Sequence, residues 1–182
     1  MRDCWLAEMN NDQQKDTLDF LLQRISKEEF LRRLRIKSED GQKFALRALE
    51  EAYCQRDSVA VELAMGLGFH FGMSAQYFDL LVKLSDAEWH ERHEDVVTAL
   101  GELHDRRSVE PLYRAALKLH PYLAYDEARA LAVKAIWALG NLGDASADEK
   151  LLALAKSEHS ILREEAEKQL RRRQPRTPAI TN

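Results

Sequence analysis

The sequence predicts an all-α protein built from paired helices, and three observations support that class. Glycine and proline are scarce, with 7 Gly and 4 Pro in 182 residues, whereas 32% of the residues are charged. Long stretches are rich in Ala, Leu, Glu, Lys and Arg, which lose little side-chain freedom in a helix. Apolar residues recur at helical spacing, and one such pattern repeats along the chain. With 45% hydrophobic residues, we expect one domain over residues 1–172.

The first helix is expected between Asp12, a plausible N-cap, and about Ile25. Its apolar residues recur at helical spacing and are expected to face the core: Leu18, Leu21 and Leu22.

Three further helix starts follow in order. Ser26 and Glu29 form a capping box, in which Ser26 accepts a hydrogen bond from the third amide while Glu29 reaches back to the amide of Ser26. Residues 38–40 open a longer helix, and Asp57 opens the next. Glycines are expected to weaken the end of that fourth helix, at positions 66, 68 and 72.

The second half of the chain contains a repeat. Ala-Leu-Gly-Glu-Leu-His-Asp at 99–105 aligns with Ala-Leu-Gly-Asn-Leu-Gly-Asp at 138–144, at an offset of 39 residues. A third copy aligns Leu131, Ala135 and Leu139 with Leu162, Ala166 and Leu170 at an offset of 31. The difference between the offsets is explained if residues 119–126 lengthen the connection inside one helix pair.

This motif resembles the bacterial HEAT-like repeats of the phycocyanobilin-lyase type, most clearly over residues 88–172. The resemblance implies an α-solenoid of antiparallel helix pairs. Small Ala and Gly residues let neighbouring helices approach closely, and Gly-Asp ends one helix and caps the next. Residues 173–182 are expected to form a disordered tail.

The charge distribution argues against nucleic-acid binding. The net charge is −4, and because the last dozen residues contribute four cations, residues 1–170 carry −8; the cations are Arg171, Arg172, Arg173 and Arg176. An acidic body repels phosphates and attracts basic proteins. No run of about 18 apolar residues predicts a membrane span, and no secretory leader is recognised, so we expect a cytoplasmic protein with reduced Cys4 and Cys54.

No catalytic or metal-binding pattern stands out. His90 and His93 are three residues apart, whereas a zincin helix needs histidines four apart. We therefore expect these histidines to lie at a solvated helix start. The sequence shows no phosphate-binding glycine loop and no nucleophile elbow, so we expect a protein that is not an enzyme and has no metal or cofactor.

Two groups of residues are candidate contacts for a partner protein. An acidic stripe opposite the core positions of one second helix contains Glu88, Glu91, Asp95, Thr98 and Glu102. Its counterparts in the later repeats include Lys134, Trp137, Asn141, Glu165, Lys168 and Arg172. We expect Trp137 to be an exposed aromatic anchor, and Tyr122, Tyr125 and Asp126 to project from the inserted connection. The alternatives are a buried Trp137, tyrosines packed back onto the helices and a merely solvated stripe.

The function expected from these features is binding to another protein. One hypothesis is an immunity protein that neutralises a cognate bacterial toxin with a basic domain. Residues 25–33 resemble segments of proteins encoded beside polymorphic toxins. A second hypothesis is an adaptor that regulates another complex. An enzyme related to phycobilin lyases or to DNA glycosylases with HEAT-like repeats is a third, but such a glycosylase uses a basic groove where this sequence predicts an acidic stripe.

Overall fold

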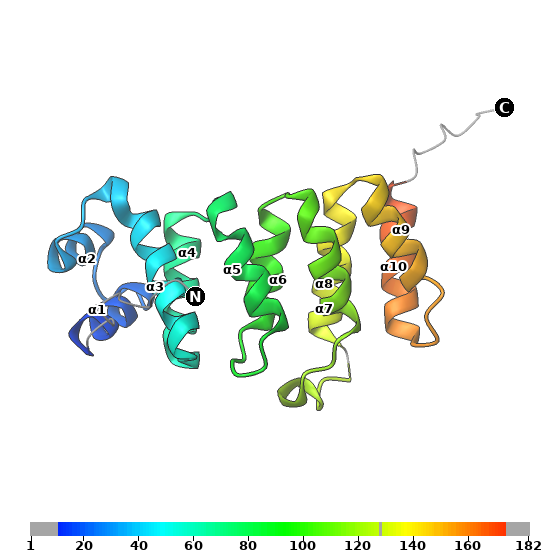
Figure 1. The fold of residues 1–182 in the computed structure, drawn as a ribbon, viewed down its shortest axis with the longest axis horizontal. Coiled ribbons are helices and arrows are strands. Elements are labelled where there is room, and N and C mark those ends of the chain that lie inside the picture. The colour runs from blue at the N-terminus through cyan, green and yellow to red at the C-terminus, as the bar shows by residue number, and fades with distance from the viewer. Residues whose placement is uncertain (1–10, 128, 174–182) are drawn as a thin grey trace. The chain divides into compact units, whose positions relative to one another are not determined.

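The computed structural model describes residues 11–127 and 129–173, and within these ranges the chain is all helical (Figure 1). The first five α-helices are α1 (Asn11–Leu21), α2 (Lys27–Leu34), α3 (Gly41–Gln55), α4 (Ser58–Phe71) and α5 (Phe78–Asp86). The other five are α6 (His93–Glu102), α7 (Val109–Leu117), α8 (Ala130–Leu142), α9 (Ala145–Leu154) and α10 (Ser160–Arg173). Four short 3₁₀ helices are η1 (Ser38–Asp40), η2 (Ala75–Tyr77), η3 (Arg106–Ser108) and η4 (Pro121–Leu123). The predicted all-α class is confirmed.

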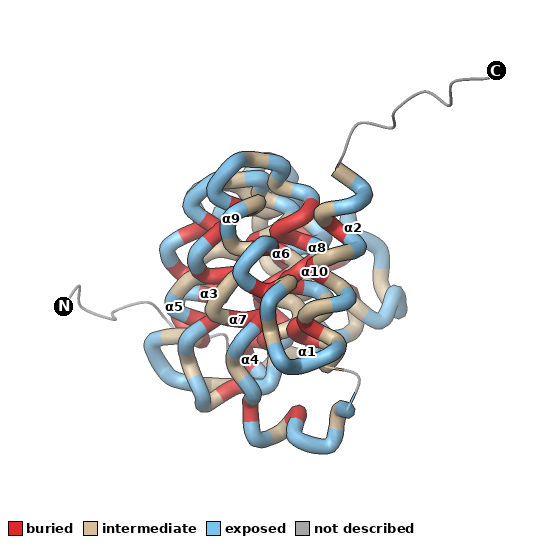
Figure 2. The backbone as a smooth tube through the Cα atoms, turned by 90° about the vertical axis from the view of Figure 1, so that its right-hand side faces the viewer, coloured by how far each residue is buried: buried red, intermediate tan, exposed pale blue. Residues whose placement is uncertain are grey.

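The chain divides into two compact units, residues 1–99 and residues 100–182, and the division falls within α6. In the first unit α3 packs against α4. In the second unit α7 packs against α8, and α10 packs against both α8 and α9. Buried positions recur among exposed ones along the helices, so each helix has one buried face (Figure 2). A single domain over residues 1–172 stays a prediction.

The first unit has an aromatic core. Phe20 stacks on Phe30 with ring centroids 4.5 Å apart, and Phe30 is fully buried. The expected first helix was wrong in its end and in part of its core face. It ends at Leu21, and both Leu18 and Leu22 are exposed, because Phe20 occupies the inward position.

The helix starts of the first unit follow the local signals. Ser26 accepts a hydrogen bond from the amide of Glu29 at 3.2 Å, as the capping box predicts. The carboxylate of Glu29 accepts hydrogen bonds from Arg32 and Arg33, where a bond to the amide of Ser26 was expected. Asp57 caps α4, which continues through Gly66 and Gly68 to Phe71. Gly66 and Gly68 lie within the helix and face Leu21 and Met73, whereas Gly72, with φ 83°, follows its last residue.

The second unit shows the close packing that its small residues predict. A Cβ atom added to Gly101 would lie 2.9 Å from the Cβ atom of Ala138, so these two helices approach closely. Gly143 ends α8 in the left-handed conformation with φ 74°, and Asp144 then caps α9 by accepting from the amide of Ala147. The Gly-Asp interpretation is confirmed at this turn.

The inserted connection is also present in the second unit. It runs from the end of α7 to the start of α8 and contains η4. The tail was predicted to begin at residue 173, but Arg173 still belongs to α10 and pairs with Asp148 at 2.5 Å. The remaining tail residues, 174–182, lie outside the described residues. None of the helices in the described ranges is long and apolar enough to cross a membrane.

Candidate protein-binding surface

His90, before α6, and His93, its first residue, are both buried, which overturns the expected solvated helix start. His90 and His93 are each 1% exposed, and their rings stack with centroids 4.3 Å apart. The Nε2 atom of His90 lies 2.9 Å from the carbonyl oxygen of Leu84, and that of His93 lies 2.7 Å from the carbonyl oxygen of Ala87. Burial lowers the pKa of His90. Through these contacts with backbone carbonyl oxygens, the two imidazoles stabilise the segment between α5 and α6.

The predicted acidic stripe is not one helical surface. Glu88 and Glu91 precede α6, which begins at His93, so they do not share a helix face with Asp95. The sequence analysis placed the start of this helix, and with it the stripe, too early because residues 88–94 are rich in helix-forming residues. Both glutamates are exposed, as is Glu102 at the end of α6.

Arg92 contacts two acidic residues of the first unit. It forms an ion pair with Glu62 of α4, and its guanidinium also lies 3.8 Å from the carboxylate of Asp95. Asp95 is therefore partly neutralised by its neighbour. Glu88 and Glu91 are exposed residues of the first unit whose negative charge attracts a basic partner.

Trp137 on α8 is exposed, as the repeat register predicts. Its side chain is 43% exposed, and its Nε1 atom donates to Glu165 of α10 at 2.9 Å. The guanidinium of Arg172 lies 5.5 Å from the indole centroid and also donates to the side chain of Asn141. The repeat alignment had placed these positions on matching faces, and the structure brings them together.

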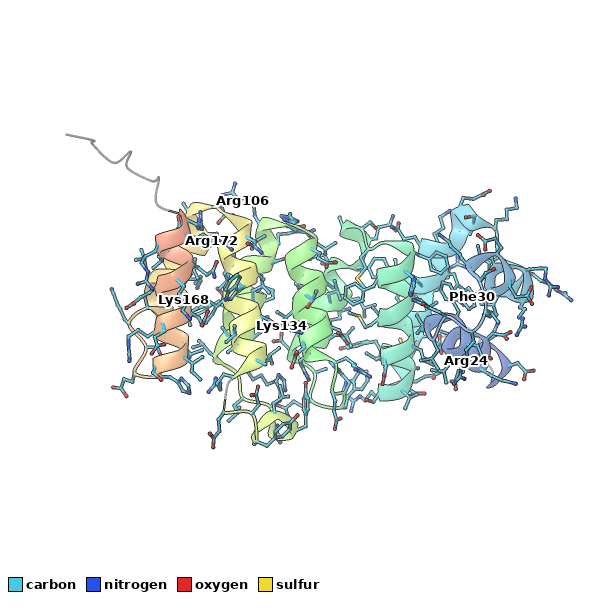
Figure 3. All side chains as sticks on the ribbon, turned by 180° about the vertical axis from the view of Figure 1, so that it is seen from behind. Arg24, Phe30, Arg106, Lys134, Lys168 and Arg172 are labelled. Atoms are coloured by element: carbon cyan, nitrogen blue, oxygen red, sulfur yellow. The ribbon has the colours of Figure 1, made fainter. Side chains whose placement is uncertain are left out.

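Basic side chains lie on the same helices as Trp137 and Glu165. Lys134, Lys168 and Arg172 are exposed and lie on the same side of α8 and α10 (Figure 3). Lys168 donates to Glu165 at 2.6 Å, and this bond and the one from Trp137 lower the pKa of the Glu165 carboxyl. Sequence reasoning listed these residues as counterparts of the acidic stripe without assigning a charge to the surface that they form.

Of the three candidate residues in the inserted connection, Tyr125 is exposed, whereas Tyr122 and Asp126 are half-buried. Tyr125 is 81% exposed. Tyr122 is half-buried and packs beside His120 with ring centroids 5.8 Å apart. The carboxylate of Asp126 accepts from the amide of Ala130 at 2.6 Å, so it caps α8. Tyr125 is therefore the strongest contact candidate in this segment.

The first unit also contains a shallow groove. Its volume is about 440 Å³, and its lining combines the aromatic core with basic side chains: Phe20, Gln23, Arg24, Ile25, Ser26, Lys27 and His70. Arg24 pairs with Asp19 at 3.1 Å, and Lys27 lies over the ring of Phe71. These side chains are engaged in structural contacts.

The described residues contain no group of three or more His, Cys, Asp or Glu side chains that could hold a metal ion. Cys54 is disulfide-bonded, so the expectation of a reduced thiol was wrong for this residue. Cys4 lies outside the described residues.

Part of the second unit is similar to a known helical repeat. Residues 131–157 match the PBS lyase HEAT-like repeat. The matched stretch contains all of α8 after its first residue and all of α9. Neither the curated proteins nor the solved structures gave a match. HEAT-like repeats typically form protein-binding modules, and that general role is what the match supports.

Proposed function

We propose that this protein is a non-catalytic binding module that holds and neutralises a cognate bacterial toxin. The observation that carries the proposal is the exposure of Trp137 and Tyr125 on a unit that contains a HEAT-like repeat. Large exposed aromatic side chains are costly in water and are enriched at the energetic centres of protein interfaces. Neutralisation then needs no chemistry, because covering the toxin's active site or substrate groove suffices.

Charge assigns different parts of a toxin to the two units. A basic toxin surface, such as one that holds nucleic acid, would be attracted by Glu88 and Glu91 of the first unit. The proposed contacts are therefore Glu88 and Glu91 for basic groups of the toxin, and Trp137 and Tyr125 for its apolar groups.

The direct test is co-expression with the product of the neighbouring upstream gene. The wild-type protein should co-purify with that product and restore growth of cells that it poisons. Replacing both aromatic residues, Trp137→Ala and Tyr125→Ala, should weaken co-purification and rescue. Leu152→Ala is the matched control, because Leu152 is 53% exposed but lies on α9, away from the aromatic residues.

Charge reversal tests the steering part of the proposal. Glu88→Lys with Glu91→Lys should slow association and weaken its dependence on salt, because attraction between exposed charges acts mainly on the association rate. Lys43→Glu with Lys83→Glu, also in the first unit, is the opposite-sign control. A harmless neighbour that does not bind, together with capture of constitutive cellular machinery, would support the adaptor function instead.

A further inference from the structure

The segment between α5 and α6 carries Glu88 and Glu91, two of the proposed contacts. It comprises residues 87–92 and is the green loop that joins α5 to α6 in Figure 1. The two glutamates stand on either side of His90 in the sequence. Because a loop has no helical hydrogen bonds of its own, other contacts must hold it in one conformation. Those contacts therefore control how the two carboxylates are presented to a partner.

His90 holds this segment through both nitrogen atoms of its ring. The Nδ1 atom accepts a hydrogen bond from the amide of Arg92 at 3.0 Å, so in the neutral ring the proton is on Nε2. The Nε2 atom lies 2.9 Å from the carbonyl oxygen of Leu84 in α5 and donates to it. A neutral imidazole has one donor and one acceptor, and both are used here. The ring therefore joins α5 to the residue just before α6.

The surroundings of His90 favour its neutral form. The ring is 1% exposed, and its centroid lies 5.2 Å from that of Trp89 and 4.3 Å from that of His93. Behind it, the ring of Tyr53 in α3 packs 5.8 Å from that of Trp89. Burial lowers the pKa of His90, and the hydrogen bond to Leu84 opposes this only in part.

The charged groups on the neighbouring helices contact Arg92. Its guanidinium forms an ion pair with Glu62 of α4 and lies 3.8 Å from the carboxylate of Asp95 in α6. The titratable group that stacks on His90 is a second imidazole, that of His93. None of these contacts supplies a carboxylate to the ring of His90, so a positive charge on this ring is not compensated.

Protonation of His90 removes one of its two hydrogen bonds and adds a buried charge. An imidazolium has two N–H donors and no acceptor, so its Nδ1 atom cannot accept from the amide of Arg92. Placing an uncompensated charge in a buried site is also unfavourable. Both penalties are relieved when the ring leaves the site, which frees residues 87–92 from α5.

We propose that protonation of His90 releases residues 87–92 from α5 and thereby weakens the binding of a basic partner to Glu88 and Glu91. The inference rests on the proposed function and adds a regulation of that site by pH. Release occurs as the pH falls below about 6.5, where the histidine of an open segment takes up a proton. Above that pH the neutral ring keeps the segment in place.

Hydrogen exchange followed by NMR tests the release on the full-length protein without any partner. The amide of Arg92 is the probe, because it donates to His90. Its protection factor, the intrinsic exchange rate divided by the observed one, should fall by up to about tenfold between pH 7.5 and pH 5.5. At pH 5.5 the amides of α4 should stay better protected than that of Arg92, because only the segment is released.

His90→Gln removes the titration but keeps a side chain that can donate to Leu84. The protection of its Arg92 amide should be the same at both pH values. His159→Gln is the matched control at an exposed histidine and should keep the wild-type response. Circular dichroism checks that both variants fold, and the wild-type exchange rates by themselves test the release if His90→Gln does not.

Two results of the exchange experiment overturn the proposal. One is equal protection of the Arg92 amide at pH 7.5 and pH 5.5 in the wild type. The other is protection of the α4 amides that is no higher than that of Arg92 at pH 5.5, because the first unit then unfolds as a whole.

Affinity for a captured toxin tests the regulation. The wild-type affinity should fall by at least about twofold from pH 7.5 to pH 5.5, because only molecules with the segment in place bind fully. The affinity of His90→Gln should fall less, and an equal fall in both proteins overturns the regulation. If the Arg92 amide reports release but no toxin is captured, the release stands and the proposed function fails. If a toxin is captured but the Arg92 amide does not respond to pH, the proposed function stands and this inference fails.

Discussion

The aromatic core of the first unit and the small-residue core of the second pack helices in different ways. In the first unit, Phe20 and Phe30 stack at 4.5 Å between α1 and α2 and fill the space between helices with large side chains. In the second, fully buried Ala135 and Ala166 occupy core positions of α8 and α10. Large side chains tolerate variable helix spacing, whereas Ala and Gly commit helices to close approach. A regular repeat therefore depends on small residues at fixed positions.

The largest expected effect tests the aromatic core. Phe30→Ala should lower the free energy of unfolding by about 3–5 kcal/mol, because a fully buried ring leaves a cavity. Urea denaturation followed by circular dichroism measures the loss. Phe69→Ala is the control at a position that is 38% exposed and should cost less than about 1 kcal/mol.

Hydrogen exchange on the Phe30→Ala variant sharpens the comparison between the units. If they are separate folding units, amides of α2 and α4 lose protection while those of α8 and α10 keep it. Equal loss in both would show that residues 1–172 unfold as the single domain that the sequence predicts.

Overpacking tests the close approach in the second unit. Gly101→Val should destabilise the protein by about 2 kcal/mol, because even a Cβ atom at this position would lie 2.9 Å from the Cβ atom of Ala138. Gly101→Ala should cost less, since the gain in helix propensity offsets part of the clash. Thermal melts of both variants measure the difference, and an unchanged melting temperature for Gly101→Val contradicts the close approach.

Buried His90 gives the stability of the first unit a dependence on pH. Burial lowers the pKa of His90 below its usual 6.5, so the unfolded chain binds a proton more readily than the folded one. The stabilising contribution of neutral His90 is present above about pH 6.5 and is lost as the pH falls below that value. Urea midpoints measured across this range should fall on acidification, and less so in His90→Asn. The exposed His159→Asn should keep the wild-type slope.

The smallest expected effect concerns two equivalent turns of the repeat. His104 adopts φ 49° where the next copy has Gly143 at φ 74°. His104→Gly should stabilise the protein by about 0.5–1 kcal/mol, because glycine adopts this conformation without a steric penalty. Gly143→Ala should destabilise it by about 1 kcal/mol for the same reason. Melting temperatures that move in the same direction for both would contradict the equivalence of the turns.

Much of the fold could be predicted because its signals are local. Ser26, Asp57 and Asp144 cap helices as their positions in the sequence predict, since a cap needs only the next three residues. The repeat offset likewise matched α8 to α10, because helical periodicity alone decides which residues share a face. The same register placed Trp137 opposite the core positions but left open whether it is exposed or buried, and the structure shows it 43% exposed.

Other properties of the candidate surface needed the tertiary structure. Composition around His90 and His93 is typical of a solvated helix, but the fold buries both rings and places their Nε2 atoms against backbone carbonyl oxygens. The prediction that the acidic residues share one helix face was wrong because α6 starts later than its sequence favours.

The sequence by itself determined the helical class, the caps and the repeat that aligns Trp137 with the positions of α10. Only the tertiary structure decided that Glu165 and Arg172 contact the indole from another helix. The physical reason is range: caps and periodicity depend on residues within one or two turns, whereas the contacts of this indole come from side chains 28 or more residues away in the chain.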